Sequence, residues 1–382
     1  MTFFGVASAG SLPIVNESGG TAAPAADPRP HLFGLRAPQL AALLGARGVD
    51  CKLAEARRLL GRVISEGKHD LLAMKKPVRT TVRNALDLLT RRDRLSVHER
   101  VTDDVDGFEK FLMRLDDGAF VECVKIPLLK PGCFTVCLSS QVGCAMGCVF
   151  CATGRMGLKR HLLAWEIVAQ LVAVRDSLKE GERITGAVFM GQGEPLHNYD
   201  EVIAAAQVLC DPTGGRIEAG NISISTVGLV PQMHRYAREG HKFRLVVSLH
   251  SAIEHKRKTF LPIAKTWSLV EVADAVRALH LSSKDRVTVA FCLMSGVNTG
   301  ADEVAALQAL LPDVPLRINL IDVNDARPPS AGGFVPPSAA ELEGFLDALQ
   351  ALGQPVVRRY SGGKQKQAAC GMLASTQVQG GP

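Results

Sequence analysis

The stretch Cys144-Ala-Met-Gly-Cys148-Val-Phe-Cys151 places three cysteines in one short loop with the spacing C-x3-C-x2-C. Thiolates are soft metal ligands, and spacings this short let one loop wrap around a metal centre. A structural zinc site or a closed iron–sulfur cluster normally takes four protein ligands. Three cysteines therefore predict an iron–sulfur cluster with one open iron, where chemistry can occur. A zinc site with a distant fourth ligand, or a redox pair of Cys148 and Cys151, are the alternatives.

The composition is that of a soluble globular protein with more than one domain. The chain has 382 residues, of which 47% are hydrophobic and 21% charged. Its formal net charge of +6 permits an anionic partner such as RNA without demanding one. The ten cysteines are sparse for so long a chain, which favours reduced thiols and a cytoplasmic location. We expect no signal peptide and no membrane span, because the N-terminus lacks a basic segment and no apolar run is long enough.

The chain divides into four segments. Residues 1–30 are rich in Ala, Gly, Ser and Pro, which predicts a disordered tail. Residues 31–105 have mostly helical apolar spacing, which predicts a small helical accessory domain. Residues 106–370 form the predicted core, which begins with a hairpin at the turn Asp116-Asp117-Gly118. Residues 371–382 are predicted to be a second tail.

Two stretches are basic, Lys75 to Arg94 in the accessory domain and Arg358 to Lys366 near the C-terminus. A run of charges is usually a solvated face. Beside a catalytic centre, a surface that contacts RNA phosphates is an equally good interpretation. The basic stretches therefore favour an RNA substrate moderately.

Beyond the hairpin, apolar strands alternate with helical segments. The predicted strands lie near residues 134–139, 184–190, 221–225, 243–249, 287–294 and 316–321. The predicted helices lie near residues 164–179, 200–210, 230–238, 268–281, 302–311 and 339–352. A last short strand is expected from Val356 to Arg359. Six strand–helix units in series predict an α/β fold with a parallel sheet, closed or partly closed into a barrel.

Polar residues follow these strands at the ends where barrels of this class carry their sites. Besides the three cysteines, they are Gly193, Glu194, Ser225, Ser248, His250 and Asn319. A glycine lets the backbone approach a ligand closely, and Glu194 can accept from a hydroxyl or ammonium group. Taken singly, each Ser, His or Asn can equally be a residue that bonds the nearby backbone. Their convergence on one rim favours a binding site.

A series of motifs stands in order between about Glu122 and Leu373. They are Cys137-Leu-Ser-Ser-Gln-Val-Gly-Cys144 continuing to Cys151, Met190-Gly-Gln-Gly-Glu-Pro195, Ser248-Leu-His250, Ile318-Asn-Leu320 and Ala368-Ala-Cys-Gly371. Together they resemble the radical S-adenosylmethionine (SAM) superfamily and, within it, the RlmN/Cfr family of RNA adenine methyltransferases. The resemblance implies a partial (β/α)6 radical SAM barrel.

The resemblance also implies the cofactors. Cys144, Cys148 and Cys151 would hold a [4Fe–4S] cluster whose open iron is chelated by SAM. The implied SAM-binding residues are Gly193, Glu194, Ser225, Ser248, Leu249, His250 and Asn319. Two SAM molecules per turnover, an electron donor such as flavodoxin and a thiol reductant are implied as well.

Three further residues receive roles only through the resemblance. Cys370 would carry the methyl group as S-methylcysteine. Cys137 would form a transient disulfide with Cys370 and so release the RNA, and Glu122 would accept the ring proton. Spacing alone leaves Cys370 a tail cysteine and Glu122 a surface carboxylate. The implied function is methylation of an adenine ring carbon, C2 or C8, in rRNA or tRNA.

The sequence departs from the family pattern at four places. Gln192 stands where Met is usual, and His161 where Asn is usual. Asp322–Asp325 replaces Pro-Trp-Asn-Pro, and Ser361–Lys366 lacks the common Gly-Asp-Asp. These departures leave the radical chemistry in place and the RNA target open. A radical SAM methylase of a non-RNA substrate and a non-catalytic RNA-binding protein are the competing hypotheses, and the retained catalytic residues argue against the second.

Overall fold

The computed structural model describes residues 27–68, 70–74 and 76–374. Most of the predicted first tail, residues 1–26, and residues 375–382 of the predicted second tail lie outside the described residues. Within the described part of the chain, no helix is long and apolar enough to cross a membrane.

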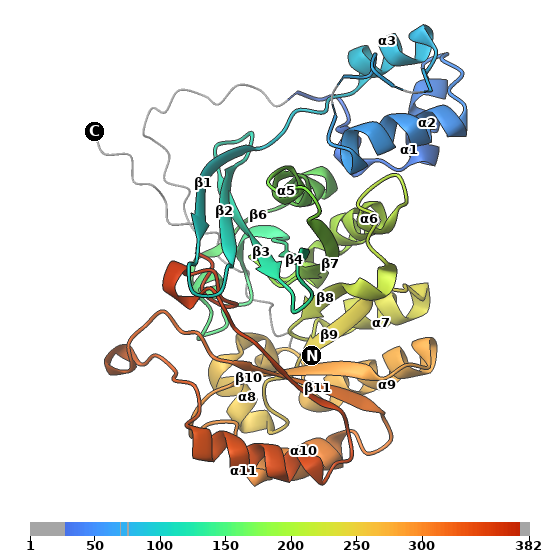
Figure 1. Cartoon of the computed structure of the whole chain (residues 1–382). Coiled ribbons are helices and arrows are strands. Elements are labelled where there is room, and N and C mark those ends of the chain that lie inside the picture. The colour runs from blue at the N-terminus through green and yellow to red at the C-terminus, as the bar shows by residue number, and fades with distance from the viewer. Residues whose placement is uncertain (1–26, 69, 75, 375–382) are drawn as a thin grey trace, which may run out of the picture.

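A ten-stranded sheet forms the body of the molecule, in the order β1-β2-β3-β4-β7-β8-β9-β10-β11-β12 (Figure 1). Its strands are β1 (Ser96–Thr102), β2 (Glu109–Arg114), β3 (Phe120–Pro127), β4 (Cys133–Cys137), β7 (Arg183–Phe189), β8 (Ile222–Thr226), β9 (Arg244–Ser248), β10 (Val287–Leu293), β11 (Leu316–Asp322) and β12 (Val356–Arg359). Strands β1 to β4 pair antiparallel, whereas every pair from β4–β7 to β11–β12 is parallel. Over the described residues β1 and β12 stay edge strands, so the sheet does not close.

Helices follow the parallel strands as the alternation predicted. They are α5 (Ala164–Asp176), α6 (Tyr199–Cys210), α7 (Val230–Glu239), α9 (Leu269–Ser283), α10 (Ala301–Leu310) and α11 (Ala339–Gln350). They lie along the right and lower sides of the sheet in Figure 1. Strand β10 is buried at every position, as expected for a parallel strand covered on both faces. The predicted α/β fold with a partial barrel is therefore confirmed.

The helical N-terminal region lies above the sheet in Figure 1 and contains α1 (Ala37–Gly45), α2 (Leu53–Leu60), a π-helical turn (Gly61–Ser65) and α3 (Thr80–Leu89). The helical domain expected over residues 31–105 is wrong for its last part, because Ser96–Thr102 is strand β1 of the main sheet. As an edge strand, β1 is almost wholly exposed, so it carries no apolar alternation that sequence analysis could detect. The predicted hairpin is formed by β2 and β3, in which Met113 pairs with Val121.

A second, two-stranded sheet was not predicted. Its strands β5 (Gln141–Cys144) and β6 (Gly157–His161) pair antiparallel and enclose the cysteine loop and the short helix α4 (Ala152–Arg155). Gly143 has φ +77°, and a Cβ there would lie 1.9 Å from the carbonyl oxygen of Gly157. Only glycine permits this close pairing. The cysteine loop therefore lies inside a hairpin, with Cys144 at the end of β5 and Cys151 at the start of α4, and does not follow a strand of the main sheet directly.

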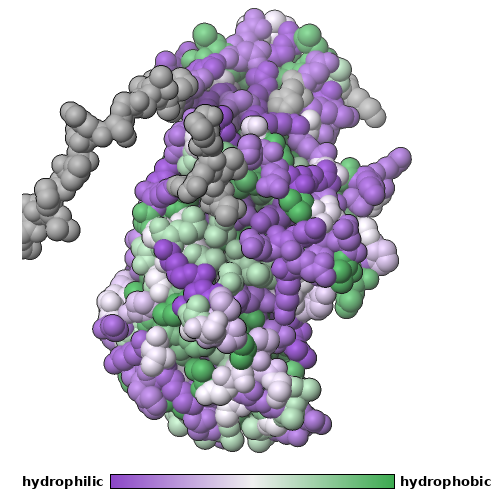
Figure 2. All heavy atoms as spheres, turned by 90° about the vertical axis from the view of Figure 1, so that its left-hand side faces the viewer, coloured by the Kyte–Doolittle hydropathy of each residue, from purple (hydrophilic) through white to green (hydrophobic). Residues whose placement is uncertain are grey.

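Most arginines of the first basic stretch are already engaged. Arg79 bonds Glu55 at 2.6 Å, and Arg91 bonds Asp116 at 2.6 Å while its guanidinium lies 4.5 Å over the Trp165 ring. The remaining paired arginines are Arg92, with Asp87, and Arg94, with Asp176. On the face shown in Figure 2, hydrophilic side chains dominate the upper part, and apolar ones gather over the middle. Contact between the helical region and RNA stays a prediction.

Candidate active site

A cavity of about 300 Å³ opens at the carboxyl ends of the parallel strands. The predicted residues that line it are Cys137, Cys144, Cys148, Cys151, Gly193, Glu194, Ser225, Ser248, His250, Asn319 and Cys370. These residues come from chain segments more than 200 positions apart, and the fold brings them to one space. Of the predicted site residues, Leu249 and Glu122 do not line the cavity.

The cysteine loop is held by its own backbone. The amide of Cys151 donates to the carbonyl of Cys148 at 3.1 Å, and the amide of Val149 donates to Phe260 at 3.0 Å. A Cβ on Gly154 would lie 2.9 Å from the amide nitrogen of Cys148, so α4 packs tightly under the loop. Burial raises the pKa of Cys144 to about 12. A metal centre bound here must therefore displace the thiol protons.

The donor set fits a cluster better than a single ion. Among the described residues, no three His, Cys, Asp or Glu side chains lie close enough to bind one metal ion. In a four-iron cluster each thiolate binds a different iron, so the three sulfurs are spaced more widely than the ligands of one zinc. All cysteines of the described residues are free thiols, including the three in the loop. The loop can therefore provide three thiolates to a [4Fe–4S] cluster.

Glu194 holds the loop that follows β7 in place. Its carboxylate accepts from the amides of Leu196 at 3.0 Å and Val227 at 3.0 Å, and its own amide donates to Gln141 at 2.7 Å. Burial raises the pKa of Glu194 to about 7, and the hydrogen bonds oppose this rise. Gly193 has φ +104°, and a Cβ there would lie 2.7 Å from the Cβ of Gln141. The glycine therefore lets the loop pass close over β5 and places a buried carboxylate in the cavity.

His250 is held in one protonation state and one orientation. It has φ 60°, unusual for a residue with a side chain, and its Nδ1 accepts from the amide of Cys292 at 2.9 Å. Burial lowers the pKa of His250 to about 3, with a contribution from Arg257. The ring is therefore neutral, and since Nδ1 is an acceptor the proton lies on Nε2.

Three further polar side chains line the same cavity. The hydroxyls of Ser225 and Ser248 bond each other at 3.0 Å. The Oδ1 atom of Asn319 is buried and accepts no hydrogen bond from any described residue. A buried acceptor without a partner is costly, so this oxygen is suited to a ligand donor.

Sequence reasoning missed Arg257 of α8 (Glu254–Phe260), a fully buried arginine behind the cavity wall. Its Nε donates to the carbonyl of Leu249 at 3.1 Å, and Nη2 donates to the carbonyl of Val227 at 2.6 Å. Leu249 therefore bonds Arg257 through its backbone carbonyl, while its side chain packs in the core. Arg257 stands between Lys256 and Lys258 in a short helix, so the sequence indicates a run of surface charges and gives no sign of a buried arginine.

The structure brings Cys137 and Cys370 together. Cys137 ends β4, and Cys370 follows the 3-10 turn Lys364–Lys366. Burial raises the pKa of Cys137 to about 12, and the nearby Cys370 thiol adds to the rise. Burial against the cavity walls and the nearby Cys151 raise the pKa of Cys370 to about 11, although the residue keeps exposed surface.

The chain after Cys370 is packed onto the cluster helix. The amide of Ala152 donates to the carbonyl of Gly371 at 2.8 Å, and the Thr153 hydroxyl donates to the carbonyl of Leu373 at 2.5 Å. Leu373 is buried. The described part of the predicted second tail, residues 371–374, is therefore part of the site and not a tail.

Glu122 lies on β3 beside the cavity, not on its surface. Its carboxylate bonds Lys110 of β2 at 3.0 Å and accepts from the Gln192 amide at 3.4 Å. Burial raises the pKa of Glu122, while Lys110 opposes the rise. Val124, two residues further along the same strand, packs with Cys137. Glu122 is therefore a buried carboxylate paired with Lys110, and not the surface carboxylate that spacing alone indicated.

Three of the residues that differ from the family pattern, Gln192, His161 and Asp325, are linked by hydrogen bonds or ion pairs to residues of the site. Gln192 is the buried neighbour of Glu122 just described. The side-chain amide nitrogen of Gln141, whose oxygen accepts from Glu194, bonds Nδ1 of His161 at 2.9 Å and Nδ1 of His197 at 3.2 Å. Asp325 bonds Arg327 at 2.6 Å, and Arg327 donates to the carbonyl of Val149 in the cysteine loop at 3.0 Å.

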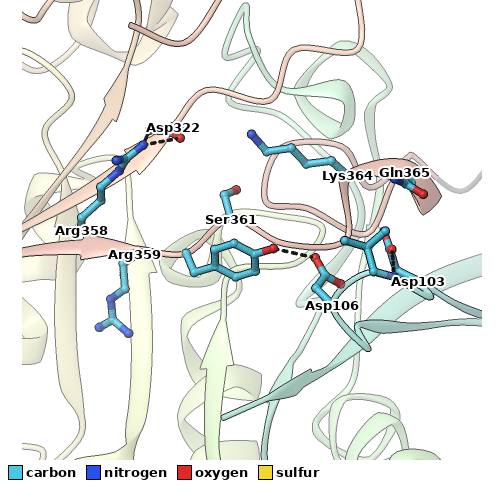
Figure 3. A pocket seen from close by; sticks show the side chains of 10 residues that line it. Asp103, Asp106, Asp322, Arg358, Arg359, Ser361, Lys364 and Gln365 are labelled. Carbon is cyan, nitrogen blue, oxygen red and sulfur yellow. Dashed lines mark hydrogen bonds and ion pairs between the residues drawn. The ribbon is translucent and has the colours of Figure 1, made fainter. Parts of the chain in front are cut away.

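A second cavity of about 560 Å³ adjoins the first, between the β1–β2 loop and the segment that leads to Cys370 (Figure 3). Asp106 accepts from the Tyr360 hydroxyl at 3.2 Å and from the amide of Gly363 at 2.8 Å. Arg359, Tyr360 and Ser361 line both cavities. The second cavity is therefore a rim of the first, and Asp106 ties this rim to the segment that carries Cys370.

Comparison with known proteins identifies the family. Residues 138–307 match the Radical SAM superfamily. A "Probable RNA methyltransferase" of Anaeromyxobacter is 50% identical, over 90% of this chain and 98% of its own length. The "Dual-specificity RNA methyltransferase RlmN 1" of Myxococcus xanthus is 40% identical, over 75% of this chain and 79% of its own.

A solved structure agrees with these sequence matches. The crystal structure of a radical SAM methyltransferase from Sphaerobacter thermophilus is similar with a TM-score of 0.80 and 34% identity, and the match covers 91% of this chain and 99% of that chain. The chain therefore belongs to the radical SAM superfamily and, within it, to the RlmN-type family of SAM-dependent radical RNA methyltransferases.

Proposed function

We propose that this enzyme methylates a ring carbon of adenine, C2 or C8, in rRNA or tRNA through an S-methylcysteine. The observation that carries the proposal is the convergence of two thiols and three cluster cysteines. Cys137 and Cys370 come from opposite ends of the core and line the same cavity as the cysteine loop. A methyltransferase that moves the methyl group directly from SAM to RNA needs no such pair.

Cys144, Cys148 and Cys151 would hold a [4Fe–4S] cluster. When bound, the cluster and two SAM molecules per turnover supply a methyl group and a radical able to remove hydrogen from it. Gly193 and Glu194 would hold the amino-acid end of SAM, since a buried carboxylate attracts its ammonium group. The remaining SAM contacts would come from Ser225, Ser248, Leu249, His250 and Asn319.

Cys370 would act as the methyl carrier. A ring carbon between two nitrogens is electrophilic and has no lone pair, so it cannot attack SAM as a nucleophile would. A thiolate can, and its attack on SAM would move the methyl group to the Cys370 sulfur and release S-adenosylhomocysteine. After hydrogen removal, the methylene carbon on Cys370 would bond the ring carbon and link protein to RNA. The unpaired electron of this link would be lost to the redox chemistry that the cluster supplies.

Glu122 and Cys137 would complete the reaction. Glu122 would take the proton from the ring carbon, and its pairing with Lys110 favours the charged form that a base requires. The Cys137 thiolate would then attack the Cys370 sulfur and form a disulfide. The sulfur–methylene bond breaks in this step, and the methylene carbon takes up a proton to become the methyl group of the released RNA. A thiol reductant must open this disulfide before the next turnover, and a flavodoxin-like donor must supply electrons. Both requirements suit the cytoplasm.

The test is mass spectrometry of nucleosides from purified rRNA and tRNA incubated anaerobically with reconstituted enzyme, SAM and a reductant. We expect a methyladenosine that is absent without enzyme, and its retention time and fragmentation distinguish C2 from C8. Steady formation of 5′-deoxyadenosine with no methylated nucleoside in either RNA would contradict the proposal. It would favour the second candidate, a radical methylase of a non-RNA substrate.

A further inference from the structure

Three arginines lie on the inner face of the open sheet, on strands that are far apart in sequence. They are Arg244 of β9, Arg317 of β11 and Arg359 of β12. Strand register places them on one face. Arg317 alternates with Asn319, Arg244 with Val246 and Ser248, and Arg359 is opposite Ile321. Asn319, Val246, Ser248 and Ile321 all line the reaction cavity.

The three side chains carry no counter-charge. Among the described residues, none forms an ion pair or a hydrogen bond with the guanidinium group of Arg244, Arg317 or Arg359. Asp285 acts on Arg244 electrostatically without forming an ion pair. Instead the arginines act on one another, since Arg317 lowers the pKa of Arg244 after the larger effect of burial. Burial, then Arg244 and Arg317, lower the pKa of Arg359.

The neighbouring arginine shows the contrast. Arg358 and Arg359 are adjacent on β12, and their side chains point to opposite sides of the strand in Figure 3. Arg358 bonds Asp322 at 3.1 Å. Three half-buried or exposed like charges left unpaired repel one another, so the arrangement is suited to an anion that shares them. Guanidinium groups match phosphate oxygens in a forked geometry.

The cluster reaches the reaction cavity through Arg359, which lines both that cavity and its rim. Arg244 and Arg317 stand at the starts of β9 and β11, on the same face as the cavity-lining residues that follow them on those strands. Strand β12 is an edge strand of the sheet, so a large ligand can reach the inner face of the sheet from the side of β12. We propose that Arg244, Arg317 and Arg359 bind a phosphate group of the RNA backbone beside the nucleotide that is methylated. This inference rests on the proposed function, because it takes RNA as the substrate.

The experiment measures RNA affinity of the reconstituted enzyme by fluorescence anisotropy, with labelled bulk tRNA and rRNA fragments at several salt concentrations. The variants are R244Q, R317Q and R359Q, and R358Q is the matched control on the same strand. Each cluster variant should weaken binding about tenfold or more, the range for one charge-assisted contact. The slope of log affinity against log salt should fall by about 0.7 for each phosphate that the variant no longer neutralises. R358Q should stay within about twofold of wild type, because its charge is already paired.

Iron content and melting temperature establish that each variant is folded, and R359Q, on an exposed edge strand, is the substitution that the fold tolerates best. Wild-type RNA affinity in folded R359Q and R317Q overturns the proposal. A second outcome would also overturn it. If calorimetry shows that the variants no longer bind inorganic phosphate but keep wild-type RNA affinity, the site binds a free anion and not RNA. If the cluster variants lose RNA affinity but the wild-type enzyme forms no methylated nucleoside, the phosphate site is upheld and only the proposed function is contradicted.

Discussion

The two ends of the reaction cavity are built in different ways. At the metal end, the three cysteines proposed as cluster ligands lie in one loop, and the residues proposed to bind SAM lie at or after the ends of β7, β8, β9 and β11. At the acceptor end, Glu122, Cys137 and Cys370 come from a hairpin, the first parallel strand and the C-terminal segment. Local spacing specifies the first set, whereas only the folded sheet assembles the second. Residue spacing alone therefore points to the chemistry at the metal end, whereas the residues of the acceptor end receive their roles in the sequence only through the family resemblance.

The two ends also differ in how they are held. Backbone hydrogen bonds fix the cysteine loop and its hairpin. The segment around Cys370 is fixed by side chains from elsewhere in addition to backbone hydrogen bonds such as that from Ala152 to Gly371. The Asn324 amide donates to the carbonyl of Cys370 at 3.3 Å, and Asp106 and Thr153 hold the residues on either side. Variants at the two ends should accordingly fail at different steps.

The largest effect is expected at the metal end. In Cys148→Ala, two thiolates cannot hold the cluster, so iron content and 5′-deoxyadenosine formation should both fall to background. Iron analysis and chromatography of SAM cleavage products measure these quantities. Cys292→Ala is the control, because Cys292 packs in the same apolar cluster and lines the cavity without belonging to the loop. Equal iron loss in both variants would show that packing, not ligation, was disturbed.

Cys370→Ala should separate the two ends. The cluster should remain, and SAM cleavage should still be detectable, while RNA methylation falls to background because no sulfur can carry the methyl group. Iron content, 5′-deoxyadenosine and methylated nucleosides are measured on the same preparation. Full methylation in this variant would rule out the two-cysteine mechanism.

Cys137→Ala should stop the reaction one step later. The protein–RNA link would form but not resolve, so RNA should remain covalently attached to the protein on a denaturing gel. Cys133→Ala, at the other end of β4, leaves the pair intact and should release its RNA. If only free RNA is recovered from Cys137→Ala after turnover, Cys137 is not the resolving thiol.

The sequence predicted the parallel strands, their helices and the metal end, because each depends on local apolar patterns or short spacings. It did not predict the β5–β6 hairpin, whose short strands are separated by the cysteine loop. Nor did it distinguish paired from unpaired arginines. Arg91 and Arg317 cannot be told apart in the sequence. In the structure, Arg91 forms an ion pair with Asp116, whereas Arg317 lies near Arg244.

The same limit applies to Glu122, whose cationic partner Lys110 lies across the hairpin. In Lys110→Met, the buried carboxylate loses the charge that lowers its pKa, so the pKa of Glu122 should rise further. A base must be ionised, so methylation is lost as pH falls through this pKa, and the loss should begin at higher pH in the variant. At pH values below this pKa we expect a single-turnover rate up to about tenfold lower, the effect of a rise of about one pKa unit. Lys110→Arg keeps the charge and should retain the wild-type profile. If the profile of Lys110→Met does not move, Glu122 is not the group whose ionisation limits the acceptor end.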